Sequence, residues 1–298
     1  MKSKQIIEKI IEAILFASAG MAVLAVCSIS VYMVIKGTPA LAEVGAREIL
    51  FNSKWAPTAS DSSYGIAYII LSSAVSTVIS VLIATVIGIL TSVFLSEIAG
   101  KRLGGLVKGA VELLAGIPSV IYGLIGMMVL NPLIFRLEKL LFANSTTHKF
   151  TGGANMLCAI IVLSVMVLPT VISVSTSSLN AASNDLRFAS YALGATKIQT
   201  IFKVVVPASR SGIITGVVLG IGRALGEAMA INMVAGGAVN LPLPFNSIRT
   251  LTTQIVSEMS YSQGTHRDVL FSVGLVLYVF IMGINLILLW FRKKENKK

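Results

Sequence analysis

Reactive side chains and charges are scarce in this chain of 298 residues. Charged residues make up 12% of it, and it holds 2 cysteines and 2 histidines. The sequence contains no Walker-type phosphate loop and no Ser/His/Asp or Cys/His arrangement. It therefore offers no visible means of covalent catalysis or ATP hydrolysis. A membrane enzyme is the least favoured class, and we expect neither a cofactor nor a metal.

The cysteines and histidines also stand far apart from one another. Cys27 and Cys158 fall within apolar runs, so we expect each to pack as a small apolar side chain rather than to form a disulfide. His148 and His266 stand alone between such runs, so we expect both to be solvated rather than to bind a metal.

Apolar residues, by contrast, are abundant. They make up 55% of the chain, and the mean hydropathy is +0.86, which is more than one water-soluble core could hide. A membrane-spanning helix needs about 20 apolar residues. Six windows meet this requirement and predict an all-α integral membrane protein with six transmembrane helices: Ile10–Val34, Ile66–Leu95, Leu106–Leu130, Met156–Leu179, Ile213–Ala235 and Val269–Phe291.

The Lys and Arg residues that flank these windows predict the orientation. Loops on the side of the two termini hold 15 of them, and the alternate loops hold 8. Because basic residues favour the cytoplasmic side, both termini and residues 180–210 are predicted to be cytoplasmic. This topology accounts for the net charge of +11, so lipid rather than nucleic acid is the expected partner. The predicted parts are a first span with an external segment (1–64), a five-helix membrane domain (65–291) and a basic cytoplasmic tail (292–298).

Two prolines fall inside predicted spans. Pro118 is expected to kink the third span and to free a backbone carbonyl, and Pro169 to kink the fourth. Glu112 follows Lys108 by four residues, which favours an ion pair on one helical face. Small hydroxyl side chains are frequent in the second span and at the end of the fourth. Helix packing and contact with a solute are both open for them.

The polar segment at about 180–207 connects the fourth and fifth spans. Residues 185–193 and 196–202 are each predicted to form a short helix. Gly194 suits the position just after the first helix, and Thr196 suits the N-cap of the second. The segment therefore reads as a pair of short helices on the cytoplasmic side.

The fifth span, which opens near Pro207, carries two charges, Arg223 and Glu227, on one predicted helical face. Each charge would cost about 2.5–3.5 kcal/mol at the bilayer centre, which excludes a lipid-facing position. We therefore expect the pair to line a solute path, with a structural ion pair as the alternative. Glycines at GxxxG spacing predict close helix packing, for which a second subunit is one candidate: Gly212, Gly216 and Gly220, and also Gly226, which follows Gly222 by four residues.

Several stretches resemble known permeases. Phe188-Ala-Ser-x-x-x-Gly194, followed by Pro207, resembles the cytoplasmic EAA loop of bacterial ABC-importer permeases, with Phe188 in place of the Glu of that motif. About residues 64–290 are similar to phosphate-specific permeases of the PstC type. The stretches that carry this similarity are FLSEIAGKR (94–102), ELLAGIPSVIYGLIG (112–126), LPT (168–170), ALGATKIQTIFKVVVPASRSGI (192–213) and GIGRALGEAMAINMVAGG (220–237).

The resemblance implies a type I ABC-importer (MetI-like) permease core in a bacterial cytoplasmic membrane. It implies an ATP-driven inorganic phosphate importer whose other parts are a PstA-like permease, a cytoplasmic ABC ATPase dimer and an external phosphate-binding protein. Arg223 and Glu227 would then lie on the phosphate path. A permease for another oxyanion, such as molybdate or sulfate, is an alternative, and a secondary carrier or channel is a more distant one. The residues that would couple to the ATPase are Ala189, Ser190, Gly194, Ala195, Thr196 and Pro207.

Overall fold

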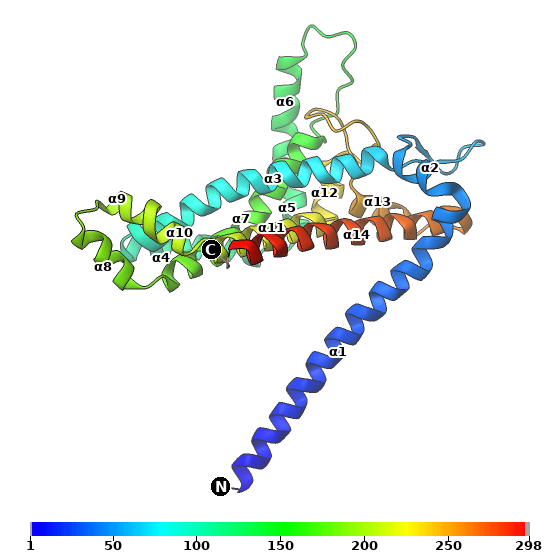
Figure 1. The fold of residues 1–298 in the computed structure, drawn as a ribbon. Coiled ribbons are helices and arrows are strands. Elements are labelled where there is room, and N and C mark those ends of the chain that lie inside the picture. Colours follow the sequence, from blue (N-terminus) through cyan, green and yellow to red (C-terminus); the bar gives the residue numbers. More distant parts are fainter. Residues whose placement is uncertain (1, 296–298) are drawn as a thin grey trace.

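The computed structural model describes residues 2–295, and the side chains of residues 8–286. This part of the chain is almost entirely helical (Figure 1). At its centre lies α7 (Met156–Ala181), an unbroken helix that contains Pro169 and packs against both α3 (Ala67–Val93) and α11 (Arg210–Gly226). Buried side chains of α7, such as Leu163 and Met166, form the middle of the main apolar core.

Small hydroxyl side chains join α3 to α7. Ser80 Oγ donates to the carbonyl of Ile160 at 3.1 Å, and Ser92 Oγ donates to the carbonyl of Ile172 at 3.0 Å. Both serines are fully buried. Small hydroxyl side chains let the two helices approach closely and form these hydrogen bonds. Helix packing therefore explains why the second span is rich in them.

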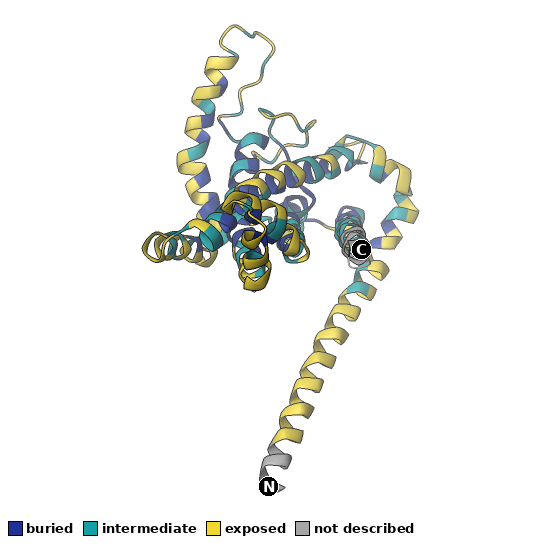
Figure 2. Ribbon diagram, turned by 60° about the vertical axis from the view of Figure 1, so that its left-hand side comes forward, coloured by how far each residue is buried: buried dark blue, intermediate teal, exposed yellow. Residues whose placement is uncertain are grey.

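The N-terminal helix α1 (Lys2–Ala40) extends far from the other helices, and its exposed surface is plain in Figure 2. Its later turns lie against α14 (Gly264–Glu295), where the hydroxyls of Ser30 and Tyr278 are 2.7 Å apart. The chain then forms η1 (Leu41–Gly45), α2 (Ala46–Phe51) and the antiparallel strands β1 (Trp55–Ala56) and β2 (Ser63–Tyr64). This N-terminal segment packs its apolar residues onto the start of α14.

The third span differs from its prediction. After η2 (Phe94–Ile98), α4 (Lys101–Gly116) ends before an extended Ile117, and α5 (Ser119–Ile125) begins after Pro118. The apolar helix long enough to cross a membrane is Ser119–Leu141, not 106–130, because α5 continues through η3 (Gly126–Leu130) into α6 (Asn131–Leu141). α6 projects away from the helices around α7 (Figure 1).

Pro118 breaks the helix rather than bending it, and the carbonyl that the break frees has a donor. The proline has no N–H for the carbonyl of Leu114, four residues earlier. The hydroxyl of Tyr122 donates to this carbonyl at 2.7 Å. A side chain of α5 therefore closes the gap left at the end of α4.

The segment after α7 forms the expected pair of short helices, α8 (Asn184–Ala192) and α9 (Lys197–Thr200). Gly194 has φ of 82°, a backbone conformation that favours glycine. Thr196 caps α9 through a reciprocal capping box with Gln199. Both local predictions are confirmed.

The chain continues from α9 through η4 (Ile201–Val205) and α10 (Val206–Ala208), then bends by 68° into α11. It ends with α12 (Met229–Val234), α13 (Leu251–Glu258) and α14. Within the described residues, five helices are long and apolar enough to span a membrane, or six if the bent pair is one span. The basic tail predicted at 292–298 begins inside α14, and its last three residues lie outside the described part.

Candidate functional site

Arg223 lies near the end of α11 and faces α7. Its Nη1 donates to Thr170 Oγ1 on α7 at 3.4 Å, and its side chain is half-buried. A guanidinium group has five N–H donors, so this single long hydrogen bond leaves most of its donor capacity for another acceptor. The position combines a permanent positive charge with a hydroxyl group from a second helix.

Glu227 lies just past the end of α11 in extended backbone, with φ of −75° and ψ of 123°. Its Oε1 accepts the N–H of Ala230 at 2.9 Å, at the start of α12. Its own carbonyl accepts the Thr252 hydroxyl at 2.8 Å. The span predicted over 213–235 is thus broken here, and among the described side chains Glu227 forms no ion pair with Arg223.

The two helix breaks lead into helices that touch each other. α5 follows the break at Pro118, α12 follows the break at Glu227, and the two helices pack together. A Cβ atom on Gly123 would lie 2.9 Å from the Cα of Ala230, so this close approach needs glycine. Discontinuous helices of this kind are where membrane transporters bind their solutes, because irregular backbone is tolerated only against protein or a wet cavity.

Three of the four glycines expected at helix contacts lie against α7. A Cβ atom on Gly212 would lie 2.2 Å from Ser178 Oγ, and one on Gly220 would lie 2.8 Å from a methyl group of Val167. Gly216 lies beside Val174, whereas a Cβ on Gly226 would meet nothing within 4 Å. The first three glycines thus hold α11 against α7 within one chain and place Arg223 beside Thr170.

The α8–α9 segment exposes large apolar side chains at one end of the molecule. Ser190 and Thr200 are buried between the two helices, with their hydroxyl oxygens 2.9 Å apart. Ala189 and Thr196 are exposed, and Ala195 is half-buried. Pro207 lies outside this pair, in α10. We give the exposed apolar side chains of α8, α9 and the residues directly after them the name coupling surface, after the role expected from the sequence: Leu186, Phe188, Tyr191, Leu193, Ile198 and Phe202.

A nearly buried ion pair holds the coupling surface to the helices behind it. Arg187 Nη2 donates to Glu97 Oε1 at 2.6 Å, and the two side chains are 15% and 8% exposed. Arg187 Nη1 also donates to the carbonyl of Ala182, at the end of α7. In the sequence, Arg187 is one of many basic residues that flank the predicted spans, and only its place one residue before Phe188 could single it out.

The two histidines are not solvated, which corrects the expectation from sequence. His148 Nε2 lies 2.8 Å from Oε1 of the fully buried Glu138, and His266 Nε2 lies 2.8 Å from Oε2 of Glu258. A buried carboxylate is costly unless donors surround it, and the imidazole rings are among those donors. Trp55 Nε1 and Arg249 also donate to Glu258, which therefore joins the N-terminal hairpin to α13 and α14.

Comparisons with known proteins agree with this architecture. Residues 84–296 match the family described as "Binding-protein-dependent transport system inner membrane component". The chain is 40% identical over 271 residues to "Probable ABC transporter permease protein YqgH" of Bacillus subtilis (strain 168), covering 89% of this chain and 84% of that protein. It is 30% identical over 263 residues to "Phosphate transport system permease protein PstC" of Pasteurella multocida (strain Pm70), covering 84% and 82%.

Solved structures with low sequence identity share the fold. A chain of a bacterial alginate ABC transporter superposes with a TM-score of 0.65 at 17% identity, covering 92% of both chains. A chain of the MetNI methionine ABC transporter gives a TM-score of 0.58 at 21% identity, covering 77% of this chain and 95% of that one. The predicted all-α, MetI-like permease fold is confirmed.

Fold and sequence together define a transport protein of the ABC class, a multi-pass permease subunit of the inner membrane. The chain belongs to the family of binding-protein-dependent transport system inner membrane components. Such permeases are not enzymes, and ATP hydrolysis lies in a partner. They work with a second permease subunit, an ATPase and a binding protein.

Proposed function

We propose that this chain is the membrane-spanning subunit of an ATP-driven importer of inorganic phosphate. The observation that carries the proposal is Arg223, a half-buried guanidinium group beside Thr170 and next to two broken helices. Guanidinium groups bind tetrahedral oxyanions through paired charge-assisted hydrogen bonds. Curated relatives at about 30% identity are described as phosphate permeases, which favours phosphate over molybdate or sulfate.

The partners follow from the same proposal. A PstA-like permease completes the path, an external phosphate-binding protein delivers the anion, and an ATPase dimer docks on the coupling surface. Exposed Phe188 and Leu193 support this docking, because an apolar patch of this kind on a helix pair marks an interaction site. Leu193 alone is 89% exposed. Because Phe188 stands where the EAA motif has a Glu, apolar contact is the main attraction between the coupling surface and the ATPase in this proposal.

ATP-driven movement would pass from the coupling surface to Arg223 in one continuous stretch of chain. η4 and α10 connect α9 to α11 across the 68° bend. Arg187 and its bond to Glu97 carry the same movement to the end of α3. Arg223 would then face the two sides of the membrane in turn, with α8 and α9 on the cytoplasmic side together with both termini.

The test is substrate-stimulated ATP hydrolysis by the complete transporter in proteoliposomes. Orthophosphate, supplied with the phosphate-binding protein, is expected to stimulate hydrolysis, whereas molybdate and sulfate are not. Stimulation by molybdate or sulfate alone would replace phosphate by another oxyanion. Solute flux without a co-purifying ATPase would instead make the chain a secondary carrier or channel.

A further inference from the structure

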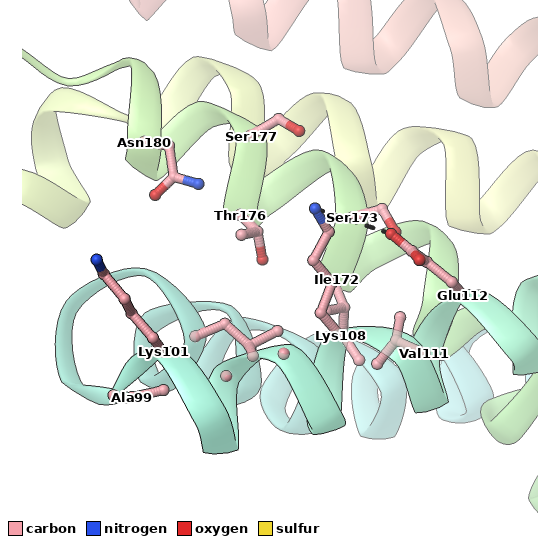
Figure 3. Close-up of a pocket in the computed structure, with 14 residues that line it drawn as sticks. Ala99, Lys101, Lys108, Val111, Glu112, Ile172, Ser173, Thr176, Ser177 and Asn180 are labelled. Atoms are coloured by element: carbon pink, nitrogen blue, oxygen red, sulfur yellow. Dashed lines mark ion pairs between the residues drawn. The ribbon is translucent and has the colours of Figure 1, made fainter.

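A cavity lined by several polar side chains lies at the end of the molecule that carries α8 and α9. Its volume is about 540 Å³, within the range of roughly 300–1,000 Å³ typical of small-molecule sites. α4 forms one wall and the last turns of α7 form the other (Figure 3). Arg223 is not among the residues that line it. The polar side chains of the two walls are Lys101, Lys108 and Glu112 from α4 and Ser173, Thr176, Ser177 and Asn180 from α7, and all but Glu112 can donate hydrogen bonds.

Lys101 and Lys108 extend from α4 toward α7, and Thr176 points from α7 toward α4 (Figure 3). We consider these side chains together with Ser173, Ser177 and Asn180, which also line the cavity. They supply two ammonium groups, three hydroxyls and an amide, all of which can donate hydrogen bonds to an oxyanion. Thr176 Oγ1 is buried and has no hydrogen-bond partner among the described residues. Because a buried hydroxyl without a partner is unfavourable, this atom favours a polar ligand in the cavity.

Among the described side chains, Lys101 forms no ion pair and Lys108 forms only a long one. Lys108 Nζ lies 3.8 Å from Glu112 Oε1, and the two side chains are 70% and 64% exposed. A pair so exposed is weak, so Lys108 can turn toward an anion. Glu112 also lines the cavity, and its negative charge would keep a bound anion from being held tightly.

Glycines keep the α4 wall open. A Cβ atom on Gly105 would meet nothing within 4 Å, and one on Gly104 would meet only Ala99, its closest atom at 3.3 Å. Both glycines line the cavity. A side chain at position 105 would therefore occupy the cavity without disturbing the packing of α4.

A row of hydroxyl groups joins this cavity to Arg223. Thr170, Ser173 and Ser177 lie at i, i+3 and i+7 of α7, which places them on one helical face. Thr170 bonds Arg223, while Ser173 and Ser177 line the cavity. At about 1.5 Å per residue, the cavity begins within roughly 10 Å of Thr170 along the helix.

We propose that this cavity is a second oxyanion site, which binds a phosphate group at the coupling end of the permease. The choice of phosphate as the ligand rests on the proposed function, but the site is built from residues other than Arg223. The same donors fit two sources of phosphate, the free anion after passage and the head group of an anionic lipid. In the first case the site delays release into the cell, and in the second it anchors α4 and α7 to the membrane surface.

Equilibrium binding of radiolabelled orthophosphate tests the site in the complete transporter, reconstituted in phosphatidylcholine nanodiscs without ATP. An Arg223→Gln background removes the arginine contribution and separates this test from the proposed function. Saturable binding is expected to persist in that background and to weaken at least about tenfold in Lys101→Gln/Lys108→Gln and in Gly105→Leu, through lost charge-assisted bonds and a filled cavity. Matched controls are Arg102→Gln and Gly109→Leu, which alter α4 outside the cavity.

Native mass spectrometry in phosphatidylglycerol nanodiscs tests the lipid source with the same variants. Orthophosphate binding that only the cavity variants weaken would establish the free anion as ligand. Loss of bound phosphatidylglycerol in those variants alone would establish the lipid head group. If neither ligand distinguishes the cavity variants from their controls, the proposal is overturned. A transporter that binds orthophosphate in the cavity but does not import it would contradict the proposed function and not this site.

Discussion

Arg187 on α8 and Glu97 on η2 form a hydrogen-bonded ion pair at 2.6 Å across 90 residues of sequence. Arg187 also donates to the carbonyls of Leu179 and Ala182, at the end of α7. One guanidinium group therefore ties α8 to the ends of two long helices. These bonds link the coupling surface to α3 and α7, so we expect a movement of the surface to reach both helices.

Arg187→Gln is expected to uncouple ATP hydrolysis from transport. Removing one partner of a nearly buried ion pair costs about 3–5 kcal/mol, because the other charge is left unpaired. We expect ATPase activity that no longer rises with substrate, measured in proteoliposomes with the complete transporter. The control is Arg102→Gln, an exposed cation on α4 whose loss should change nothing. Normal substrate stimulation in Arg187→Gln would show that this pair carries no movement.

The coupling surface should be required for ATPase assembly. Leu193→Ser/Ile198→Ser removes two large apolar side chains that are 89% and 70% exposed, so folding should be unaffected while an interface is lost. We expect at least about a tenfold loss of co-purified ATPase, since buried apolar side chains contribute about 1.5–3 kcal/mol each. Leu140→Ser, 78% exposed on α6, is the matched control. Equal recovery of the ATPase from both variants would argue against docking here.

Glu258 is expected to hold the N-terminal hairpin in place. Glu258→Ala leaves Arg249 and His266 without their carboxylate and removes the acceptor of Trp55 Nε1, so we expect a loss of about 3–5 kcal/mol in stability. The measurement is thermal unfolding followed by Trp55 fluorescence. A Trp290→Phe background leaves Trp55 as the single tryptophan of the chain. The exposed Glu43→Ala is the control.

The same carboxylate acts on a nearby phenol. Partial burial and then the charge of Glu258 raise the pKa of Tyr261, while Arg249 lowers it. Glu258→Ala should therefore shift the Tyr261 titration toward lower pH. Unchanged unfolding and an unchanged titration together would mean that the cluster is not formed.

Local signals in the sequence were sufficient for some features and not for others. Gly194 and Thr196 were predictable because capping depends on neighbours a few residues away. Pro118 disturbs its helix through a local effect as well, although the sequence predicted a kink and the structure has a break. Pro169 lies inside the continuous helix α7. The resemblance to the EAA loop over Phe188–Gly194 also indicated that the end of α8 is exposed.

Long-range contacts were not predictable. The break at Glu227 has no proline, and the helical periodicity runs through it. At the break, Thr252 donates to the Glu227 carbonyl from 25 residues away. Likewise, Trp55 reaches Glu258 across 203 residues, a contact that no local pattern indicates.

Two roles can be separated for Glu227: the proposed one, as a charge near the anion path, and the observed one, as the side chain that caps the Ala230 N–H in the first turn of α12. Glu227→Gln keeps an oxygen that can accept the Ala230 N–H but removes the charge, whereas Glu227→Ala removes both. We expect both variants to lose phosphate uptake, because both lose the charge, while membrane insertion survives. Loss in the Ala variant alone would restrict Glu227 to capping, which is worth about 0.5–2 kcal/mol.

The most direct test of the account is phosphate uptake by Arg223→Gln. The measurement is ATP-dependent uptake of radiolabelled orthophosphate into proteoliposomes, with equal amounts of assembled transporter and with Arg267→Gln, an exposed arginine outside the site, as control. We expect uptake to fall by about 10- to 100-fold, as lost charge-assisted hydrogen bonds to the anion predict. Uptake by Arg223→Gln equal to that of Arg267→Gln would contradict the assignment of this arginine to the anion path.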